Sequence, residues 1–125
     1  MLFCIIDDER EVCDMLRLFF EARGHQCVLA YDGAAGLEAI HKHHPAAVFL
    51  DVAMPRMTGF EVLAKLRADP AFAQLPVLLM SALVREQRRS SEEWAKATGA
   101  TAFIEKPFEL DELLRLVEKL TGVGV

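Results

Sequence analysis

The chain of 125 residues alternates short apolar runs with longer amphipathic stretches, and five such rounds fit along its length. Short runs rich in β-branched and aromatic residues are typical of buried strands, whereas apolar residues at i, i+3, i+4 and i+7 indicate helices. Strands that alternate with helices of this size form right-handed βαβ units, and hence a parallel sheet covered on both faces. The sequence therefore predicts a flavodoxin-like, doubly wound α/β fold with five strands in the order 2-1-3-4-5.

The element boundaries follow from the apolar runs and from the turn residues between them. The expected strands are Leu2–Ile6, Gln26–Ala30, a third run that ends at Asp51, Val77–Met80 and Thr101–Ile104. The expected helices carry apolar faces at Val12–Phe19, Gly33–Ile40, Phe60–Leu66, a longer polar stretch at Val84–Thr98, and Leu110–Val117. Asp32 is expected to cap the second helix, and Thr58 with Glu61 has the spacing of a capping box for the third.

Composition limits the kinds of partner and the cellular compartment. The net charge is −5 and no strongly basic cluster is present apart from three arginines at 85–89, so direct binding to nucleic acid is not expected. No apolar segment approaches the roughly 18 residues of a membrane-spanning helix, which predicts a cytoplasmic protein without membrane contact. The three cysteines lack a CxxC spacing and are expected to be buried apolar residues: Cys4, Cys13 and Cys27.

Reactive side chains follow four of the five predicted strands. Asp7 and Asp8 follow the first strand, Asp51 ends the third, Ser81 follows the fourth and Lys106 follows the fifth. The carboxyl ends of parallel strands share one edge of the sheet, so these groups should converge there. Three converging carboxylates repel one another, and a proton or a metal must resolve the cluster. Oxygen ligands alone favour magnesium, and a hydroxyl with a lysine suits a phosphoryl group.

Each of these residues also has an ordinary structural explanation. Asp8 with Glu11 could cap a helix, and Ser81 could be a cap as well. Lys106 could be a solvated charge at the end of a strand. Their joint placement at successive strand ends is what favours a functional site.

The segments that carry these residues resemble the receiver domain of two-component response regulators. The matching segments are IIDDE around Asp7 and Asp8, LDVAMPRMTG around Asp51, LLMSA ending at Ser81 and Ala82, and FIEKPF around Lys106 and Pro107. The resemblance covers nearly the whole chain. It implies a receiver domain over residues 1–121, followed by a short tail at 122–125. Such a domain acts as a phosphorylation-dependent signalling switch rather than as a turnover enzyme.

The resemblance also implies a phosphoacceptor and its metal. Asp51 would accept a phosphoryl group from a histidine kinase or a phosphotransfer protein. Asp8 would bind magnesium directly, Asp7 would act mostly through a metal-bound water, and the backbone carbonyl of Ala53 would complete the protein ligands, together with Asp51 itself.

The remaining family positions imply a switch. Ser81 would hydrogen-bond the phosphoryl group once it has arrived. Lys106 would pair with Asp51 before phosphorylation and with a phosphoryl oxygen afterwards, and its peptide bond to Pro107 would be cis. Phe103 occupies the position of the switch aromatic residue, which phosphorylation would draw inward.

Two apolar residues flank the path that a hydrolytic water must take in such a site. They are Ala53 and Leu83, the second residues after the phosphoacceptor and after the hydroxyl residue. Neither side chain can orient a water, and leucine is large enough to cover the phosphoryl group. We therefore expect a long-lived phosphorylated state.

The output surface is expected on the face formed by the fourth helix, the fifth strand and the fifth helix, where a downstream protein would bind. Residues near this face that could contact such a partner are Arg85, Arg88, Arg89 and Trp94. The segment around Val84–Ser91 is longer than receivers usually carry.

Two other classes of function stay open at this point. A magnesium phosphatase of the haloacid dehalogenase type also forms a phosphoaspartate, but it requires a second acid two residues after the nucleophile, where this chain has Ala53. The other class is a receiver-like binding module that takes no phosphoryl group, which the complete set of site residues argues against.

Overall fold

A computed structural model describes residues 1–82 and 90–122, without the side chains of residues 91 and 92. It contains one parallel sheet in the order β2-β1-β3-β4-β5, so the predicted fold class and strand order are confirmed. The strands are β1 (Leu2–Ile6), β2 (Gln26–Ala30), β3 (Ala47–Asp51), β4 (Val77–Ser81) and β5 (Ala102–Glu105). Each runs within one residue of its predicted bounds where those were stated at both ends.

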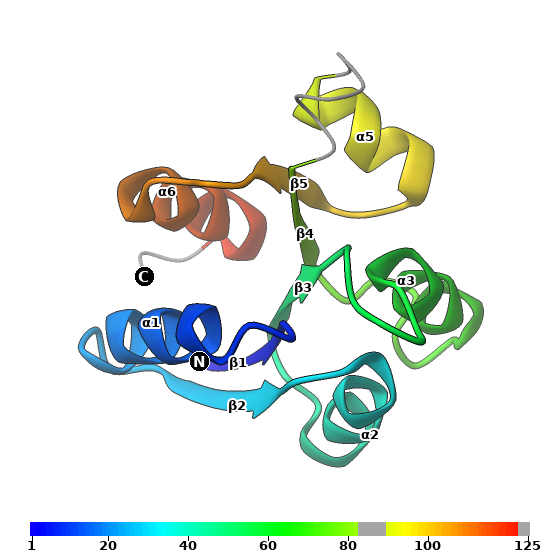
Figure 1. Cartoon of the computed structure of the whole chain (residues 1–125), viewed down its shortest axis with the longest axis horizontal. Helices are drawn as coiled ribbons and strands as arrows, with labels where there is room; N and C mark the ends of the chain where they lie inside the picture. The colour runs from blue at the N-terminus through cyan, green and yellow to red at the C-terminus, as the bar shows by residue number, and fades with distance from the viewer. Residues whose placement is uncertain (83–89, 123–125) are drawn as a thin grey trace.

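Helices cover both faces of this sheet (Figure 1). Those in the described part of the chain are α1 (Arg10–Glu21), α2 (Gly33–His43), α3 (Gly59–Ala68), α5 (Ser91–Thr98) and α6 (Leu110–Thr121). Helices α1 and α6 lie on one face, and α2, α3 and α5 lie on the other. None of the helices in the described ranges combines the length and the apolar character that a membrane crossing requires.

Two apolar clusters, one on each face, hold the helices to the sheet. Alternate residues of β1 enter different clusters, because successive side chains of a strand point to opposite faces. Phe3 packs edge-on against Phe20 of α1 and against Phe49 of β3, with ring centroids 4.9 and 5.4 Å apart. Every residue of β3 and β4 is buried. This double burial explains why their sequences read as continuous apolar runs.

The predicted long helix Val84–Thr98 is wrong as a single element. Ser90 has an extended backbone, with φ −68° and ψ 160°, and its side chain accepts a hydrogen bond from the Glu93 backbone N–H. Ser90 is therefore the cap of a helix that starts at Ser91, since a cap residue stands outside the helical conformation. The preceding residues of the predicted helix, 84–89, lie outside the described part of the chain.

The predicted caps of α2 and α3 are confirmed. The Asp32 side chain accepts a hydrogen bond from the Ala35 N–H at 2.8 Å, and Thr58 accepts one from the Glu61 N–H at 3.3 Å. Helix α1 differs, because its N-cap is Glu9 and no side chain caps it. Capping was the alternative explanation for Asp8, and in the structure Asp8 does not perform it.

The start of α3 lies against the backbone of the strand that ends at Asp51. The Gly59 N–H donates to the Val52 carbonyl at 2.9 Å. A Cβ at Gly59 would overlap the Asp51 carbonyl oxygen and would lie 2.9 Å from the Val52 Cα. These are backbone atoms that cannot rotate aside, so only glycine fits where α3 approaches the end of β3.

We expect Gly59→Ala to lower the free energy of unfolding by about 1–3 kcal/mol, because the overlap forces the backbone of β3 or of α3 to shift. Urea denaturation followed by circular dichroism measures this change. Ala64→Ser, on the exposed side of the same helix, is the control and should cost at most about 0.5 kcal/mol. Equal midpoints for Gly59→Ala and the wild type would show that the close approach imposes no constraint.

Candidate functional site

The carboxyl edge of the sheet brings together the polar residues that the sequence singled out. Asp7 follows β1, Asp51 ends β3 and Ser81 ends β4, and these three are the buried polar or charged residues of the described chain. Asp51 lies beside Met80 in the register of β3 with β4, and Ser81 lies beside Glu105 of β5. The Lys106 N–H donates to the Ser81 carbonyl at 2.9 Å, which carries the lysine to the same edge.

The ammonium of Lys106 links three acids from two strand ends. Its Nζ lies 2.8 Å from Asp7 Oδ2, 3.2 Å from Asp51 Oδ1 and 3.6 Å from Glu9 Oε1. Asp7 is fully buried and Asp51 is 4% exposed. No other ion pair reaches Asp7 or Asp51 among the residues the structure describes. The site therefore has more negative than positive charge.

This imbalance changes the acidity of Asp51. Burial is the largest cause that raises the pKa of its carboxyl, the charge of Asp7 adds to the effect, and together they bring the pKa to about 7 although Lys106 opposes them. Burial alone would lower the pKa of Lys106, but its hydrogen bond to Asp7 and the charges of Asp51 and Asp7 outweigh it and raise that pKa. Lys106 thus stays charged, while Asp51 needs more positive charge nearby to ionise fully at neutral pH.

The three aspartates have the chemistry of a site for a hard divalent cation. One carboxylate oxygen from each of Asp7, Asp8 and Asp51 lies within 4.8 Å of the others. Asp8 is exposed, so a cation can reach the cluster from solvent. All-oxygen ligands with a single lysine as counter-charge fit magnesium, which binds through one or two carboxylates and keeps several waters. The donor set and its excess negative charge therefore fit the predicted ion.

The backbone around Asp7 holds its carboxylate in place. The Glu9 N–H donates to Asp7 Oδ1 at 2.9 Å, and the Asp7 N–H donates to the Ala30 carbonyl at 3.1 Å. The thiol of Cys13, on α1, donates to the Asp7 carbonyl at 3.3 Å. Burial raises the pKa of this thiol to about 12, so Cys13 packs as a neutral group. The three cysteines are free, and Cys4 and Cys13 are buried as the sequence predicted. Cys27 is only half-buried, because its strand β2 lies at the edge of the sheet.

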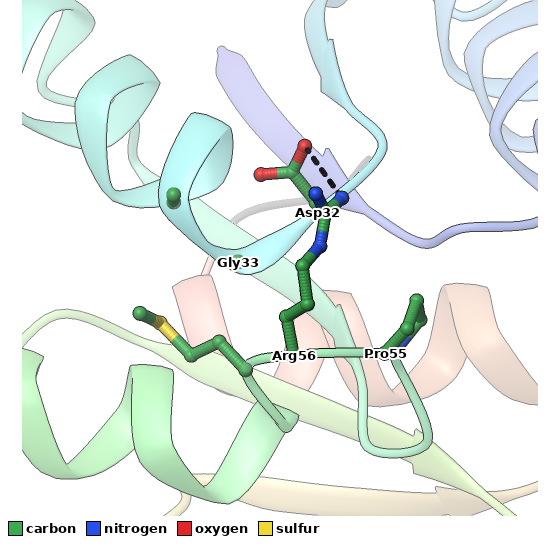
Figure 2. Close-up of a pocket in the computed structure, with 6 residues that line it drawn as sticks. Asp32, Gly33, Pro55 and Arg56 are labelled. Atoms are coloured by element: carbon green, nitrogen blue, oxygen red, sulfur yellow. Dashed lines mark ion pairs between the residues drawn. The ribbon is translucent and has the colours of Figure 1, made fainter.

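The loop after Asp51 rests against the start of α2. Arg56 has a left-handed backbone, with φ 67°, and its guanidinium lies 4.0 Å from the Asp32 carboxylate (Figure 2). The two side chains border a hollow of about 270 Å³ that is also lined by Gly33, Pro55 and Met57. A Cβ at Gly33 would lie only 3.0 Å from Met57 Sδ, so glycine allows this loop to pack closely on α2.

Phe103, which is expected to turn inward on phosphorylation, lies in the core of this structure. Its side chain is 3% exposed and stacks on Trp94 of α5, with ring centroids 5.6 Å apart. Trp94 in turn stacks on Phe60 of α3 at 6.2 Å. These rings fill the space between α3, α5 and β5. The inward movement of Phe103 on phosphorylation stays a prediction. The stacking also shows that Trp94 has a packing role.

Other predicted residues stand as follows. The Lys106–Pro107 peptide bond is cis. Ala53 is exposed, and the role of its carbonyl as a metal ligand stays a prediction. Four predicted residues lie outside the described part of the chain: Leu83, Arg85, Arg88 and Arg89.

Sequence analysis missed the contact of Glu9 with Lys106, although the acidic run Asp7–Glu9 was the available signal.

Several known proteins are similar to this chain in sequence. A family model described as the response regulator receiver domain matches residues 3–118. The chain is 36% identical over 115 residues to the transcriptional regulatory protein KdpE of Mycobacterium tuberculosis, covering 90% of this chain and 47% of that protein. It is 35% identical over 120 residues to the response regulator MprA of Mycobacterium avium, covering 96% and 50%. The chain thus spans about half the length of these curated relatives.

Solved structures of similar shape cover the chain almost completely. The receiver domain of Francisella response regulator 1452 superposes with a TM-score of 0.85 at 27% identity, covering 97% of this chain and 96% of that one. The chemotaxis protein CheY4 of Vibrio cholerae superposes with a TM-score of 0.84 at 26% identity, covering 95% and 97%.

The raised pKa of Asp51 predicts a pH-dependent stability in the absence of divalent cations. The folded chain binds this proton more tightly than the unfolded chain, whose carboxyl titrates near 3.8. Stability is therefore highest below pH 4 for this group and is lost as the pH rises through about 7. Asp51→Asn, which stays neutral, should be more stable than the wild type at pH 8, by roughly 2–4 kcal/mol.

Thermal and urea unfolding between pH 5 and pH 8 measure this difference, which should shrink toward pH 5. Asp111→Asn removes an exposed carboxylate at the start of α6 and should bring no comparable gain. If Asp51→Asn and the wild type had the same stability at pH 8, the buried charge of Asp51 would not destabilise the fold.

Proposed function

The chain belongs to the response regulator receiver family, and from this premise we propose that Asp51 is its phosphoryl acceptor. The family places the chain in phosphorylation-based signalling. The observation that carries the proposal is the Lys106 ammonium, which contacts Asp51 at 3.2 Å and Asp7 at 2.8 Å in a buried site. The phosphoryl donor is a histidine kinase or a phosphotransfer protein, and the protein is a switch that does not turn over a substrate.

In this reaction a carboxylate oxygen of Asp51 attacks the phosphorus of a phosphohistidine. The P–N bond breaks, and the imidazole nitrogen keeps its electron pair. Lys106 donates to Asp51 in the resting site and is close enough to donate to a phosphoryl oxygen after transfer. The Ser81 hydroxyl, at the end of the neighbouring strand, would donate to another phosphoryl oxygen after transfer. Because Lys106 already contacts Asp51 before the reaction, this donor needs little reorganisation.

Asp7, Asp8 and Asp51 hold a magnesium ion in this proposal, with the Ala53 carbonyl as a further ligand. When bound, magnesium supplies the positive charge that neutralises the transferring phosphoryl group. Asp7 remains paired with Lys106 at 2.8 Å, which suits contact with the metal through a water. Asp8 is exposed, which suits direct ligation of an ion that arrives from solvent.

The apolar residue two positions after Asp51 separates this function from that of a phosphoaspartate phosphatase. Ala53 supplies no acid to activate a hydrolytic water, so we expect a stable phosphoprotein rather than turnover. Leu83 is expected to extend the lifetime further, although it lies outside the described residues. The phosphorylated domain signals to a downstream protein through the surface of α5, β5 and α6, where Trp94 contributes to the packing.

The proposal is tested by incubating the protein with magnesium and acetyl phosphate, or with a panel of phosphorylated histidine kinases. The wild type should gain the mass of one phosphoryl group, and Asp51→Asn should gain none, because the amide that replaces the carboxylate is nearly isosteric but not nucleophilic. Intact-mass spectrometry reads the result. Phosphorylation of Asp51→Asn at the wild-type level would rule out Asp51 as the acceptor.

A further inference from the structure

Glu9 stands between the buried acids and solvent. It is the N-cap of α1, yet its carboxylate makes no cap hydrogen bond. Its Oε1 lies 3.6 Å from Lys106 Nζ, although the side chain is 65% exposed. Its backbone N–H donates to Asp7 Oδ1 at 2.9 Å. The backbone of Glu9 therefore orients an acid of the site, while its side chain faces the site lysine from the solvent side.

The three acids around Lys106 differ in burial and in their distance from its ammonium. Asp7 and Asp51 are buried and held by the ends of β1 and β3, so their positions are fixed by the fold. Glu9 is the exposed member of the three, and its contact with Lys106 is the longest. After phosphoryl transfer the ammonium must face a phosphoryl oxygen, and a carboxylate that attracts it toward solvent competes with this contact.

We propose that Glu9 is a positioning residue that restrains the Lys106 ammonium and thereby slows phosphoryl acceptance by Asp51. The inference rests on the proposed function of Asp51. With acetyl phosphate as donor, a carboxylate oxygen of Asp51 bonds to phosphorus, the bond from phosphorus to the acyl oxygen breaks, and acetate leaves with the electron pair. Lys106 stabilises the phosphoryl oxygens during this step, so its release from Glu9 should speed the reaction.

A neighbouring acid provides a matched control. Asp8, Glu9, Arg10 and Glu11 line one hollow of about 480 Å³ at the mouth of the site. Glu11 is exposed like Glu9, but it forms no ion pair with Lys106 in the described part of the chain. Glu9→Gln and Glu11→Gln thus remove the same charge from the same hollow, and only the first removes a contact with Lys106. Glu9→Gln also keeps the backbone donor to Asp7.

The experiment measures the rate of phosphorylation by acetyl phosphate with magnesium, by quenched intact-mass spectrometry, for the wild type and both variants. Glu9→Gln should be phosphorylated about 2–5 times faster, a size that matches an exposed ion pair. Glu11→Gln should stay close to the wild type. In a Lys106→Met background, where the restrained group is gone, Glu9→Gln should bring no acceleration.

Beryllofluoride with magnesium gives a second measurement that needs no reaction, since it occupies the phosphoryl position. Its affinity, measured by calorimetry, should rise about 2–5 fold in Glu9→Gln and stay unchanged in Glu11→Gln. Equal effects of the two variants, or an acceleration that persists in the Lys106→Met background, would overturn the role of Glu9. A slower Glu9→Gln variant with wild-type thermal stability would overturn it as well.

The results for the wild type and for Glu9→Gln separate a wrong function for Asp51 from a wrong role for Glu9. A wild-type protein that takes neither the phosphoryl group nor beryllofluoride contradicts both. A wild-type protein that is phosphorylated on Asp51, with no change of rate or affinity in Glu9→Gln, contradicts only the role of Glu9.

Discussion

The Lys106 ammonium is the charge on which the carboxyl edge of the sheet depends. Two buried carboxylates, Asp7 and Asp51, would be costly to ionise without a cation, and Lys106 contacts both. Lys106 compensates the negative charge only in part, since the pKa of Asp51 still rises to about 7. One lysine cannot balance the acids around it, and this remaining negative charge prepares the site for a divalent cation and a phosphoryl group.

The strand order makes this arrangement possible. Because β1 pairs with both β2 and β3, the end that carries Asp7 lies next to the end that carries Asp51. Strand β4 separates β3 from β5, and the long side chain of Lys106 crosses this distance to reach both acids. The close approach of Gly59 to the end of β3 adds a constraint from α3. A rigid sheet with a packed core on each face thus fixes the positions of the charged groups.

Much of this architecture could be predicted from the sequence, because alternating apolar runs and helical faces are strong local signals. The convergence of Asp7, Asp51, Ser81 and Lys106 also followed, since each ends or follows a strand and parallel strand ends share an edge. The start of α5 was missed even though Ser90 and Glu93 have capping-box spacing. The polar stretch Val84–Thr98 contains no proline or glycine that would divide it, so this cap signal was overlooked.

The features that could not be predicted from the sequence depend on tertiary packing. The burial of Phe103 is set by Trp94 and Phe60, which come from two different helices. The contact of Glu9 with Lys106 joins residues 97 positions apart in the chain, and no periodic pattern indicates it. The left-handed backbone of Arg56 also has no local signal, since the position carries neither glycine nor asparagine.

A crystal structure of the protein with magnesium and beryllofluoride tests the account most directly. We expect beryllium bonded to a carboxylate oxygen of Asp51, magnesium beside Asp7, Asp8 and Asp51, and the Lys106 Nζ within hydrogen-bond distance of a fluorine. Beryllofluoride bound away from Asp51, or a lysine that makes no contact with it, would contradict the role of this charge cluster as a phosphoryl-acceptor site.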